Sequence, residues 1–291
     1  MKRTKSELLF DAGNTIVMLL LILVTFYPFY YVFIASISDS KELISHTGIL
    51  LAPLGFNTDA YNMVFHNPNI GTGYANTIFI VISGTVINMV MTIVAAYALS
   101  RDFMLKNTIM MGIIFTMFFS GGLIPNFLLV NNILHLGESY WALILPGAIN
   151  TWNLIVMRTS FRGIPESLIE SARMDGAGEM RILARIVLPL SMPVISVMLL
   201  YYGVAHWNSW FSALLYLRER KMYPLQLILR EILILNNTES MSAGTAAGDQ
   251  EAIGESIKYA TIMVATLPIL AVYPLLQKYF VKGVMVGAIK E

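Results

Sequence analysis

The distribution of charged residues most constrains the fold of this 291-residue chain. Six stretches contain no Asp, Glu, Lys or Arg, and each is about as long as the roughly 20 helical residues that cross a hydrocarbon core of about 30 Å. Only 13% of residues are charged and 56% are hydrophobic, against about 25% and about 45–50% in soluble domains. The pattern predicts an all-α polytopic membrane protein with six transmembrane helices. The charge-free stretches are 12–38, 60–100, 107–137, 139–157, 186–217 and 259–277.

One span core is placed within each of these stretches. Gly121, Gly122 and Pro125 are expected to break the third helix near its outer end, because glycine and proline interrupt helical hydrogen bonding. The first apolar stretch is too long for a signal peptide and lacks a small-residue cleavage site, so we expect it to be retained. The cores are Thr15–Ile37, Tyr74–Leu99, Asn107–Val130, Tyr140–Met157, Val187–Leu215 and Tyr259–Gln277.

The connections between the spans indicate how the chain is oriented. Thirteen of the 19 Lys and Arg residues lie in tails and connections that are cytoplasmic if the N-terminus is inside, as the positive-inside rule requires. The outside segment 216–258 weakens this bias with five basic residues, although long translocated loops follow the rule less closely. The expected organisation is a cytoplasmic tail at 1–14, a membrane domain at 15–277 with a cytoplasmic loop at 158–189 and external loops at 38–73 and 216–258, and a cytoplasmic C-terminal tail at 278–291.

Several classes of function are excluded by what the sequence lacks. There are no cysteines, so thiol chemistry and disulfides are absent. The four histidines show no metal-ligand spacing, and a net charge of +1 argues against nucleic acid as a partner. No phosphate-binding G-x-x-x-x-G-K-[ST] loop is present, so we expect this chain to bind no ATP or other cofactor itself. No catalytic constellation lies at membrane depth, which argues against an enzyme.

The segment 164–193 is the one long stretch that is both charged and helix-patterned. Pro165 suits a first helical position, and Asp175 with Gly176 is expected to end a short helix. A second helical pattern follows until Pro189 interrupts it. Such an amphipathic elbow is also typical of an ordinary interfacial loop, so periodicity alone assigns it no function. The apolar faces are predicted to hold Leu168, Ile169 and Ala172 in the first helix, and Met180, Leu183 and Val187 in the second.

The identities and spacing of residues in this segment are more specific than its periodicity. They resemble the cytoplasmic EAA loop of ABC importer permeases, the membrane subunits that are fed by separate substrate-binding proteins. One position departs from the family pattern, where Ser171 replaces the usual Ala and leaves the helix face almost unaltered. The matching order is Glu170-Ser171-Ala172, three residues, Gly176, nine residues, Ile186, one residue, and Leu188-Pro189.

The resemblance implies partners and a role for the elbow. This chain would be one half of a heterodimeric pore in the bacterial cytoplasmic membrane, with both termini cytoplasmic. Its partners would be a second homologous permease subunit, a cytosolic ABC ATPase dimer that holds ATP and Mg²⁺, and an extracytoplasmic solute-binding lipoprotein. In the coupling helix, Glu170 would face a basic residue of the ATPase, Ala172 would allow close approach and Gly176 would make the corner. The implied ATPase-coupling residues are Glu166, Leu168, Ile169, Glu170, Ser171, Ala172, Asp175, Gly176, Ile186, Leu188 and Pro189.

Polar and aromatic residues within the spans are candidates for a substrate pathway. Sugars are commonly bound by aromatic rings that cover their C–H faces and by polar side chains that bond their hydroxyls. The same residue types also mediate helix packing and form interfacial aromatic belts, so both interpretations stay open. The candidates are Asn88, Asn126, Trp152, Asn153, Tyr201, Trp207, Asn208 and Trp210.

Features outside the loop narrow the resemblance. The six-span order, the pair Trp207-Asn208 and the ending QKYFVKGVMVGAIKE are similar to the carbohydrate-uptake subfamily, in particular the maltose-permease-G-like and LplC/YtcP-type permeases. This similarity implies import of an oligosaccharide or a polysaccharide fragment. An ABC permease for a non-sugar solute shares the loop and is the main alternative. An ion-coupled secondary transporter is less favoured, because that class keeps ionisable residues within its spans.

Overall fold

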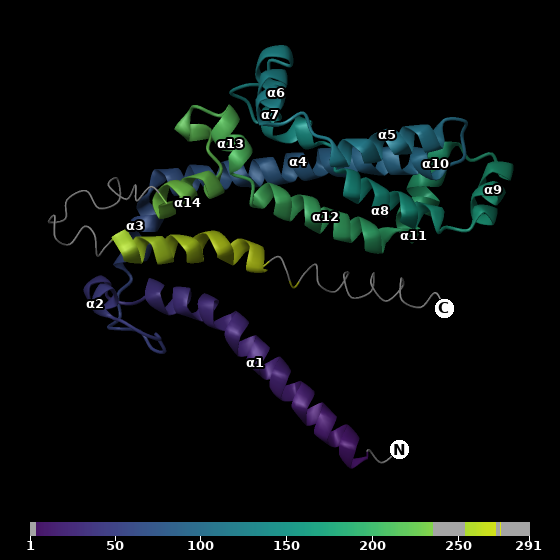
Figure 1. The fold of residues 1–291 in the computed structure, drawn as a ribbon. Coiled ribbons are helices and arrows are strands. Elements are labelled where there is room, and N and C mark those ends of the chain that lie inside the picture. The colour runs from purple at the N-terminus through teal and green to yellow at the C-terminus, as the bar shows by residue number, and fades with distance from the viewer. Residues whose placement is uncertain (1–3, 235–253, 272–273, 275–291) are drawn as a thin grey trace. The chain divides into compact units, whose positions relative to one another are not determined.

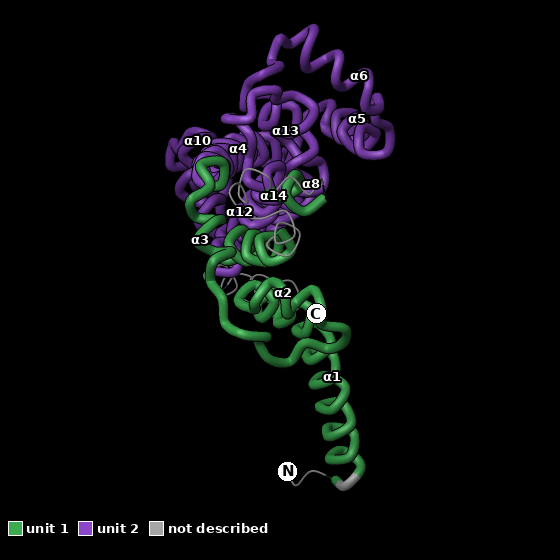
Figure 2. The backbone as a smooth tube through the Cα atoms, turned by 90° about the vertical axis from the view of Figure 1, so that its left-hand side faces the viewer, with its two compact units in different colours: residues 1–70, 229–267 green, residues 71–228, 268–291 purple. Residues whose placement is uncertain are grey.

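Helices make up all the regular secondary structure that the computed structural model describes, which covers residues 4–234, 254–271 and 274 without a β-strand. The chain divides into two compact units. The first combines residues 1–70 with 229–267, and the second combines 71–228 with 268–291 (Figure 2). The predicted all-α fold class is confirmed for the described residues.

The first unit is built on one long helix, α1 (Lys5–Ser36). Thr4 and Glu7 form a capping box at its start, which satisfies backbone N–H groups that have no partner within the helix. Its apolar side chains are exposed from Leu8 to Phe26, as expected of a helix whose solvent is lipid. The helix begins inside the segment predicted to be a cytoplasmic tail.

The remainder of the first unit packs around the last turns of α1. Two short helices, α2 (Ser40–Ser45) and α3 (Asp59–His66), lie in the connection that was expected to be an external loop. Ile34, Leu43 and Leu50 form a buried cluster there. A helical segment at 254–267 joins it, with the ring of Tyr259 edge-on to Tyr31 at 5.9 Å. This part of the chain therefore has a small core of its own.

The second unit carries most of the helices. They are arranged as long helices with a short helix, α9, set across one end (Figure 1). The elements in chain order are α4 (Pro68–Ser100), whose first three residues belong to the first unit, α5 (Lys106–Phe118), α6 (Leu123–Leu128), the π-helical turn η1 (Leu129–Ile133), α7 (Trp141–Ile144), the 3₁₀ turn η2 (Leu145–Gly147), α8 (Thr151–Arg162), α9 (Glu166–Met174), α10 (Glu179–Ile182), the π-helical turn η3 (Leu183–Val187), α11 (Leu188–Leu190), α12 (Met192–Trp207), α13 (Phe211–Tyr216) and the 3₁₀ turn η4 (Arg220–Met222). The next helix, α14 (Leu225–Ile234), begins in the second unit and belongs to the first unit from residue 229.

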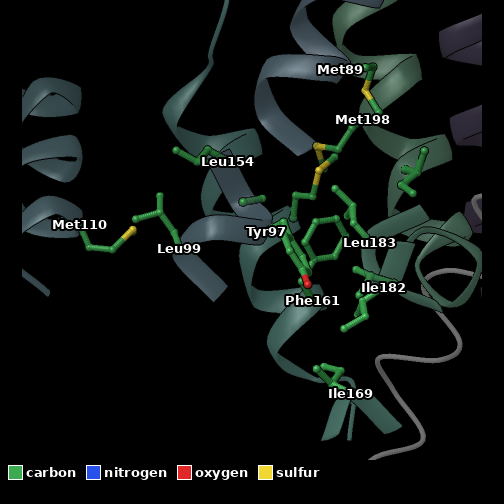
Figure 3. Close-up of a cluster of buried hydrophobic side chains, with 14 of the residues drawn as sticks. Met89, Tyr97, Leu99, Met110, Leu154, Phe161, Ile169, Ile182, Leu183 and Met198 are labelled. Atoms are coloured by element: carbon green, nitrogen blue, oxygen red, sulfur yellow. The ribbon is translucent and has the colours of Figure 1, made fainter. Parts of the chain in front are cut away.

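The core of this unit lies where α4, α8, α12 and the 164–190 segment meet. Phe161 of α8 is buried beside Tyr97 of α4, and Met198 of α12 belongs to the same cluster (Figure 3). Met157 of α8 is also a buried member of this cluster. Ile169 of α9 belongs to the same cluster. The charged segment is therefore attached to the bundle by apolar packing.

By length and hydropathy, the described residues contain two single helices able to cross a membrane. They are Ser6–Ser36 and Pro68–Ser100, and they confirm helices at the first and second predicted spans. Two bent pairs qualify if each pair counts as one crossing: Lys106–Phe118 with Leu123–Ile133, bent by 112°, and Glu179–Leu190 with Met192–Trp207, bent by 86°. The described residues thus contain apolar helices of membrane-spanning length, as the charge-free stretches predicted.

The third predicted span breaks where the glycines predicted it would. α5 ends at Phe118 and α6 begins after Gly122, whose φ of +87° lies in the left-handed region that glycine tolerates. Pro125 follows in the first turn of α6, where its missing N–H costs no intrahelical hydrogen bond. The prediction of a helix break at this position is confirmed.

The fourth and fifth predicted spans are not continuous helices, and this is a correction. Residues 140–157 were expected to form one helix, but the chain leaves helical geometry at Asn150, just after Pro146. Residues 187–215 were also expected to be continuous, but the helix bends at Ser191 and is interrupted again at 208–210. Pro189 and Pro193 flank the first of these bends and remove backbone donors on both sides.

The remaining predictions concern the end of the chain. Helix α14 confirms the amphipathic pattern near residue 225. The predicted sixth span is helical from 259 to 271. Its end, most of the loop that follows α14, and the predicted tail at 278–291 lie outside the described residues.

Candidate functional site

We define the elbow as residues 164–190, which contain α9, α10, η3 and α11. In Figure 1, α9 stands at the end of the bundle, across the direction of α4 and α12. Pro165 was predicted to be the first helical residue, but it is the N-cap, and α9 begins at Glu166. Glu166 places a carboxylate in the first turn, where the helix dipole favours negative charge.

Local hydrogen bonds close the C-terminal end of α9. The Gly176 N–H donates to the Arg173 carbonyl at 3.0 Å, and the Ala177 N–H donates to the Ala172 carbonyl at 2.9 Å. This is the Schellman arrangement, which requires a left-handed residue after the helix. Gly176 supplies it with a φ of +79°. The predicted corner at Asp175 and Gly176 is confirmed.

One face of α9 is buried and the opposite face is exposed. Ile169 is 1% exposed and packs below Phe161 and Ile182 (Figure 3), while Ala172 is half-buried against the same cluster. Burying an isoleucine side chain contributes about 1.5–3 kcal/mol. Leu168 was predicted on this face, but it is 47% exposed. The exposed residues of the predicted coupling set are Glu166, Leu168, Glu170, Ser171, Asp175, Gly176 and Pro189.

Polar contacts hold both helices of the elbow to α4. The hydroxyl of Tyr97, a buried residue in the last turn of α4, donates to Glu179 Oε2 at 2.5 Å. Arg173, in the last turn of α9, donates from Nε to Glu179 Oε1 at 2.9 Å. The hydrogen bond from Tyr97, followed by the hydrogen bond and charge of Arg173, holds the pKa of the Glu179 carboxyl below its ordinary value. Glu179 thus joins α4, α9 and α10.

The buried face of the second half of the elbow differs from the predicted one. Met180 was expected on the buried face with Leu183 and Val187, but it is 71% exposed. Its place is taken by Ile182, because residues 183–187 form a π-helical turn that shifts the register of the side chains. Ile186 and Leu188, both from the predicted coupling set, are half-buried against the core cluster.

A polar clamp holds the break between α7 and α8. We define the clamp as Asn88, Thr92, Asn150, Tyr202 and His206. Asn88, from the middle of α4, donates from Nδ2 to the carbonyl oxygens of residues 147 and 148 at 2.7 and 2.9 Å. These are carbonyls left without helical partners by the break, and such groups must be satisfied where no water is present.

The clamp extends from α4 to α12. Because the Nδ2 of Asn88 is used as a donor, its Oδ1 accepts from His206 Nε2 at 2.6 Å, and this ring nitrogen carries the proton. One helical turn away on each helix, the Tyr202 hydroxyl accepts the N–H of Asn150 at 3.1 Å and lies 2.7 Å from Thr92 Oγ1. Gly84 leaves room for the ring, since a Cβ there would lie 2.5 Å from His206 Nε2. The clamp therefore joins three helical segments.

The predicted pathway residues are not gathered into one site. Asn88 is in the clamp, and Asn153 is buried at the start of α8, where its N–H donates to the Asn150 side chain. Trp152, Tyr201 and Asn126 are exposed, and in the described part of the chain no side-chain hydrogen bond or ring contact joins them to one another.

The aromatic end of α12 has a separate environment. Trp207 lies edge-on to Tyr74 at 6.4 Å and lines an apolar cavity of about 390 Å³ with Leu199 and Ile82. Asn208 is exposed at the helix end, and Trp210 contacts the ring of Phe211 edge-on at 5.5 Å. These contacts show aromatic packing, and they leave any role in a substrate pathway a prediction.

Sequence reasoning missed the bond between Tyr97 of α4 and Glu179 of the elbow. Of the clamp residues it selected Asn88 as a candidate, but not Thr92, Asn150, Tyr202 or His206. Their partners are far away in sequence, from 52 to 118 residues in the clamp. No local pattern identifies such pairs. The available signal was the presence of polar groups in a bilayer, which need partners.

Known proteins resemble this chain over nearly its whole length. The family described as "Binding-protein-dependent transport system inner membrane component" matches residues 88–286. The polygalacturonan/rhamnogalacturonan transport system permease protein YtcP of Bacillus subtilis (strain 168) is 40% identical over 279 residues, which cover 94% of this chain and 95% of that protein. Protein LplC of the same organism is 40% identical over 293 residues, covering 100% and 98%. A chain from the crystal structure of a bacterial ABC transporter involved in the import of the acidic polysaccharide alginate has a TM-score of 0.85 at 30% identity, covering 96% of this chain and 99% of that one.

Proposed function

The chain belongs to the family of inner membrane components of binding-protein-dependent transport systems, and from that membership we propose that it is the permease subunit of an ATP-driven importer of an oligosaccharide or polysaccharide fragment. Two of the similar proteins are named for the carbohydrate that they import or transport: polygalacturonan or rhamnogalacturonan for one, and alginate for the other. These are polymers of sugars, and this supports a carbohydrate substrate over amino acids, peptides or polyamines. The family match also sets aside the ion-coupled secondary transporter.

The proposed topology has six crossings and both termini in the cytoplasm. The crossings are α1, α4, the bent pair that begins with α5, the broken segment from α7 to α8, the segment that contains α12, and the helical segment that begins at 254. Irregular backbone at the breaks is compatible with membrane depth because protein covers it, as at the clamp. The distribution of basic residues among the connections supports a cytoplasmic position for the elbow.

The elbow is the proposed docking point for a cytosolic ATPase dimer, which would hold ATP and Mg²⁺. The observation that supports this most directly is the two-faced packing of α9: Ile169 ties it to the bundle while Glu170 and Leu168 stay exposed for a partner. Met174 and Met180, which are 88% and 71% exposed, extend the apolar part of that face. Flexible, apolar methionines are common at docking surfaces.

The proposed mechanism transmits a displacement. Closure of the ATPase dimer on ATP would bring together this elbow and that of a second, homologous permease subunit. Because packed helices shift between discrete arrangements, the movement would tip the spans from inward-open to outward-open. An extracytoplasmic lipoprotein would then deliver the sugar. This chain performs no chemistry and is not expected to bind a cofactor.

A matched pair of glycine variants tests the elbow. Gly176→Val places a β-branched residue at a φ of +79°, a strain of roughly 1–3 kcal/mol, although a Cβ there meets nothing within 4 Å. We expect it to abolish substrate-stimulated ATP hydrolysis by the purified complex while the chain still inserts in the membrane. Gly178→Val is the control, because the φ of Gly178 is −73° and its Cβ position is equally open. Full stimulation in the Gly176 variant would refute the proposed coupling role.

A further inference from the structure

A polar cavity is lined in part by the elbow, through Glu166 and Arg173, and in part by the ends of α4 and α8. Its volume is about 220 Å³, and it lies between the end of α4, the end of α8 and the start of α9. Three arginines contribute to its lining, together with two carboxylates. The polar lining residues are Ser100, Arg101, Asp102, Arg162, Glu166 and Arg173.

Arg101 has buried hydrogen-bond donors without acceptors. Its guanidinium carbon lies 4.6 Å from the centroid of the Tyr97 ring, which fixes the plane of the group. Its Nε and Nη2 atoms are buried, and neither has a hydrogen-bond partner in the described part of the chain. Buried donors are satisfied in nearly all native structures, and a guanidinium presents paired N–H groups that suit the oxygens of one anion. The acceptor is therefore expected to come from outside this chain.

Only some of the charged residues that line the cavity are paired with an opposite charge. Asp102 is paired with Lys106, and Arg173 is paired with Glu179. Arg101, Arg162 and Glu166 have no ion-pair partner among the described residues, which leaves two cations and one carboxylate. Arg162 is exposed at the end of α8 and can turn toward an anion. The lining thus has a net capacity for one negative charge.

The depth of the cavity identifies the kind of anion. This depth rests on the proposed crossing by α4: Arg101 directly follows Ser100, the last residue of that candidate span, and the proposed crossing brings the cavity to the level of the lipid headgroups. The next residues are apolar and exposed: Phe103 by 42%, Met104 by 96% and Leu105 by 55%. Such side chains suit contact with acyl chains next to a bound headgroup. A binding site for a soluble anion would not need apolar side chains beside it.

We propose that this cavity binds the phosphate group of an anionic membrane lipid, with Arg101 as the principal ligand and Arg162 as the second. Arginine matches the geometry of phosphate with two parallel hydrogen bonds. The lipid would fill the space between α4, α8 and α9, and so would brace the elbow against the bundle. Unlike the coupling role, this site needs no ATPase to be detected.

The test is lipid retention by the full-length chain. Nanodiscs with equal parts of phosphatidylglycerol and phosphatidylcholine would be the source, and native mass spectrometry would count the lipids that stay bound. We expect the wild-type chain to retain one phosphatidylglycerol, and Arg101→Gln to retain it about ten- to a hundredfold more weakly, as loss of charge-assisted hydrogen bonds predicts. Arg181→Gln is the matched control, because Arg181 is an exposed arginine of the elbow that does not line the cavity.

A second variant and two competing probes complete the test. Arg162→Gln changes only an exposed side chain, so it keeps the test valid if Arg101→Gln fails to fold, and it should also weaken retention. Inorganic phosphate that displaces the lipid at equal concentration would overturn the proposal in favour of a free anion. Equal lipid retention by the wild-type chain and both cavity variants would also overturn it. Unchanged retention with loss of co-purifying ATPase would instead assign the cavity to a protein carboxylate.

Discussion

The elbow and the clamp are both places where a helix is interrupted, but they are built in opposite ways. The corner of the elbow is closed by residues within six positions of one another, through the Schellman hydrogen bonds and the left-handed Gly176. The break at 147–150 is satisfied by side chains 52 to 60 residues away, on α4 and α12. One interruption is local, and the other depends on the assembled bundle.

This difference suggests a division of labour. Within the elbow, helix α9 keeps its own shape and is attached to the rest of the protein mainly by the burial of Ile169 and by the hydrogen bonds of Glu179. Helix α8 runs from the clamp at Asn150 to the elbow at Arg162. We expect the clamp end to act as the fixed point and the elbow end as the displaced one. The following variants test that contrast.

The largest effect is expected from the apolar attachment of the elbow. Ile169→Ala removes a side chain that is 1% exposed, and it should destabilise α9 by about 2–5 kcal/mol. Hydrogen exchange should show faster exchange in α9 with little change in α4. The control is Leu168→Ala. The Leu168 side chain is 47% exposed, so its truncation should destabilise α9 by less than about 1 kcal/mol. Equal loss of protection in α4 would mean that the elbow is not a separate element.

The clamp should respond globally. Asn88→Ala leaves the carbonyls of 147 and 148 and the His206 N–H without partners, at a cost of about 2–3 kcal/mol. We expect a lower unfolding midpoint in detergent and faster exchange in both α8 and α12. Ser83→Ala on the same helix removes only a hydrogen bond to Phe79 one turn earlier, so it should be nearly neutral. An equal shift of the unfolding midpoint in both variants would mean that the clamp does not stabilise the bundle.

A smaller effect is expected for the hydrogen bond between α4 and the elbow. Tyr97→Phe removes the donor to the Glu179 carboxylate and should cost about 1.5–3 kcal/mol, with Tyr201→Phe as the exposed control.

The hydrogen bond between Tyr97 and Glu179 also makes the stability of the elbow depend on pH. Because the folded-state pKa of Glu179 is lowered, its contribution is complete above the unfolded value of about 4.3 and is lost as the pH falls through the folded-state pKa. Exchange in α9 at acidic pH should report this loss, and the Tyr97 variant should reduce it.

The smallest change in stability is expected at the end of α12. Asn208→Ala alters an exposed residue and should change the free energy of unfolding by less than about 0.5 kcal/mol. If Asn208 contacts substrate, uptake of different sugar fragments should change in relative rate. Trp207→Ala should change uptake in the same direction, but with some loss of stability because it packs on Tyr74. Unchanged selectivity in both variants would restrict these residues to packing.

The predictability of each region from sequence follows the same local and non-local division. The ends of α9, the break after α5 and the long helices α1 and α4 were predicted because Gly, Pro and charge-free runs act within a few residues. The face that holds Ile182 instead of Met180 was not predicted, since a π-helical turn leaves no distinctive pattern. The clamp and the Tyr97–Glu179 bond were missed because each joins groups that only the folded bundle brings together.

The proposed docking of an ATPase on the elbow can be tested directly with one introduced thiol. The native chain contains no cysteine, so Glu170→Cys would introduce its only thiol, on the exposed face of α9. The rate of maleimide labelling would be measured with and without the ATPase subunits, with Arg218→Cys, on the segment proposed to be external, as the reference. If the ATPase docks on the elbow, it should slow the labelling of position 170 by at least about tenfold and leave the labelling rate of position 218 unchanged. Equal labelling at position 170 in both conditions would contradict it.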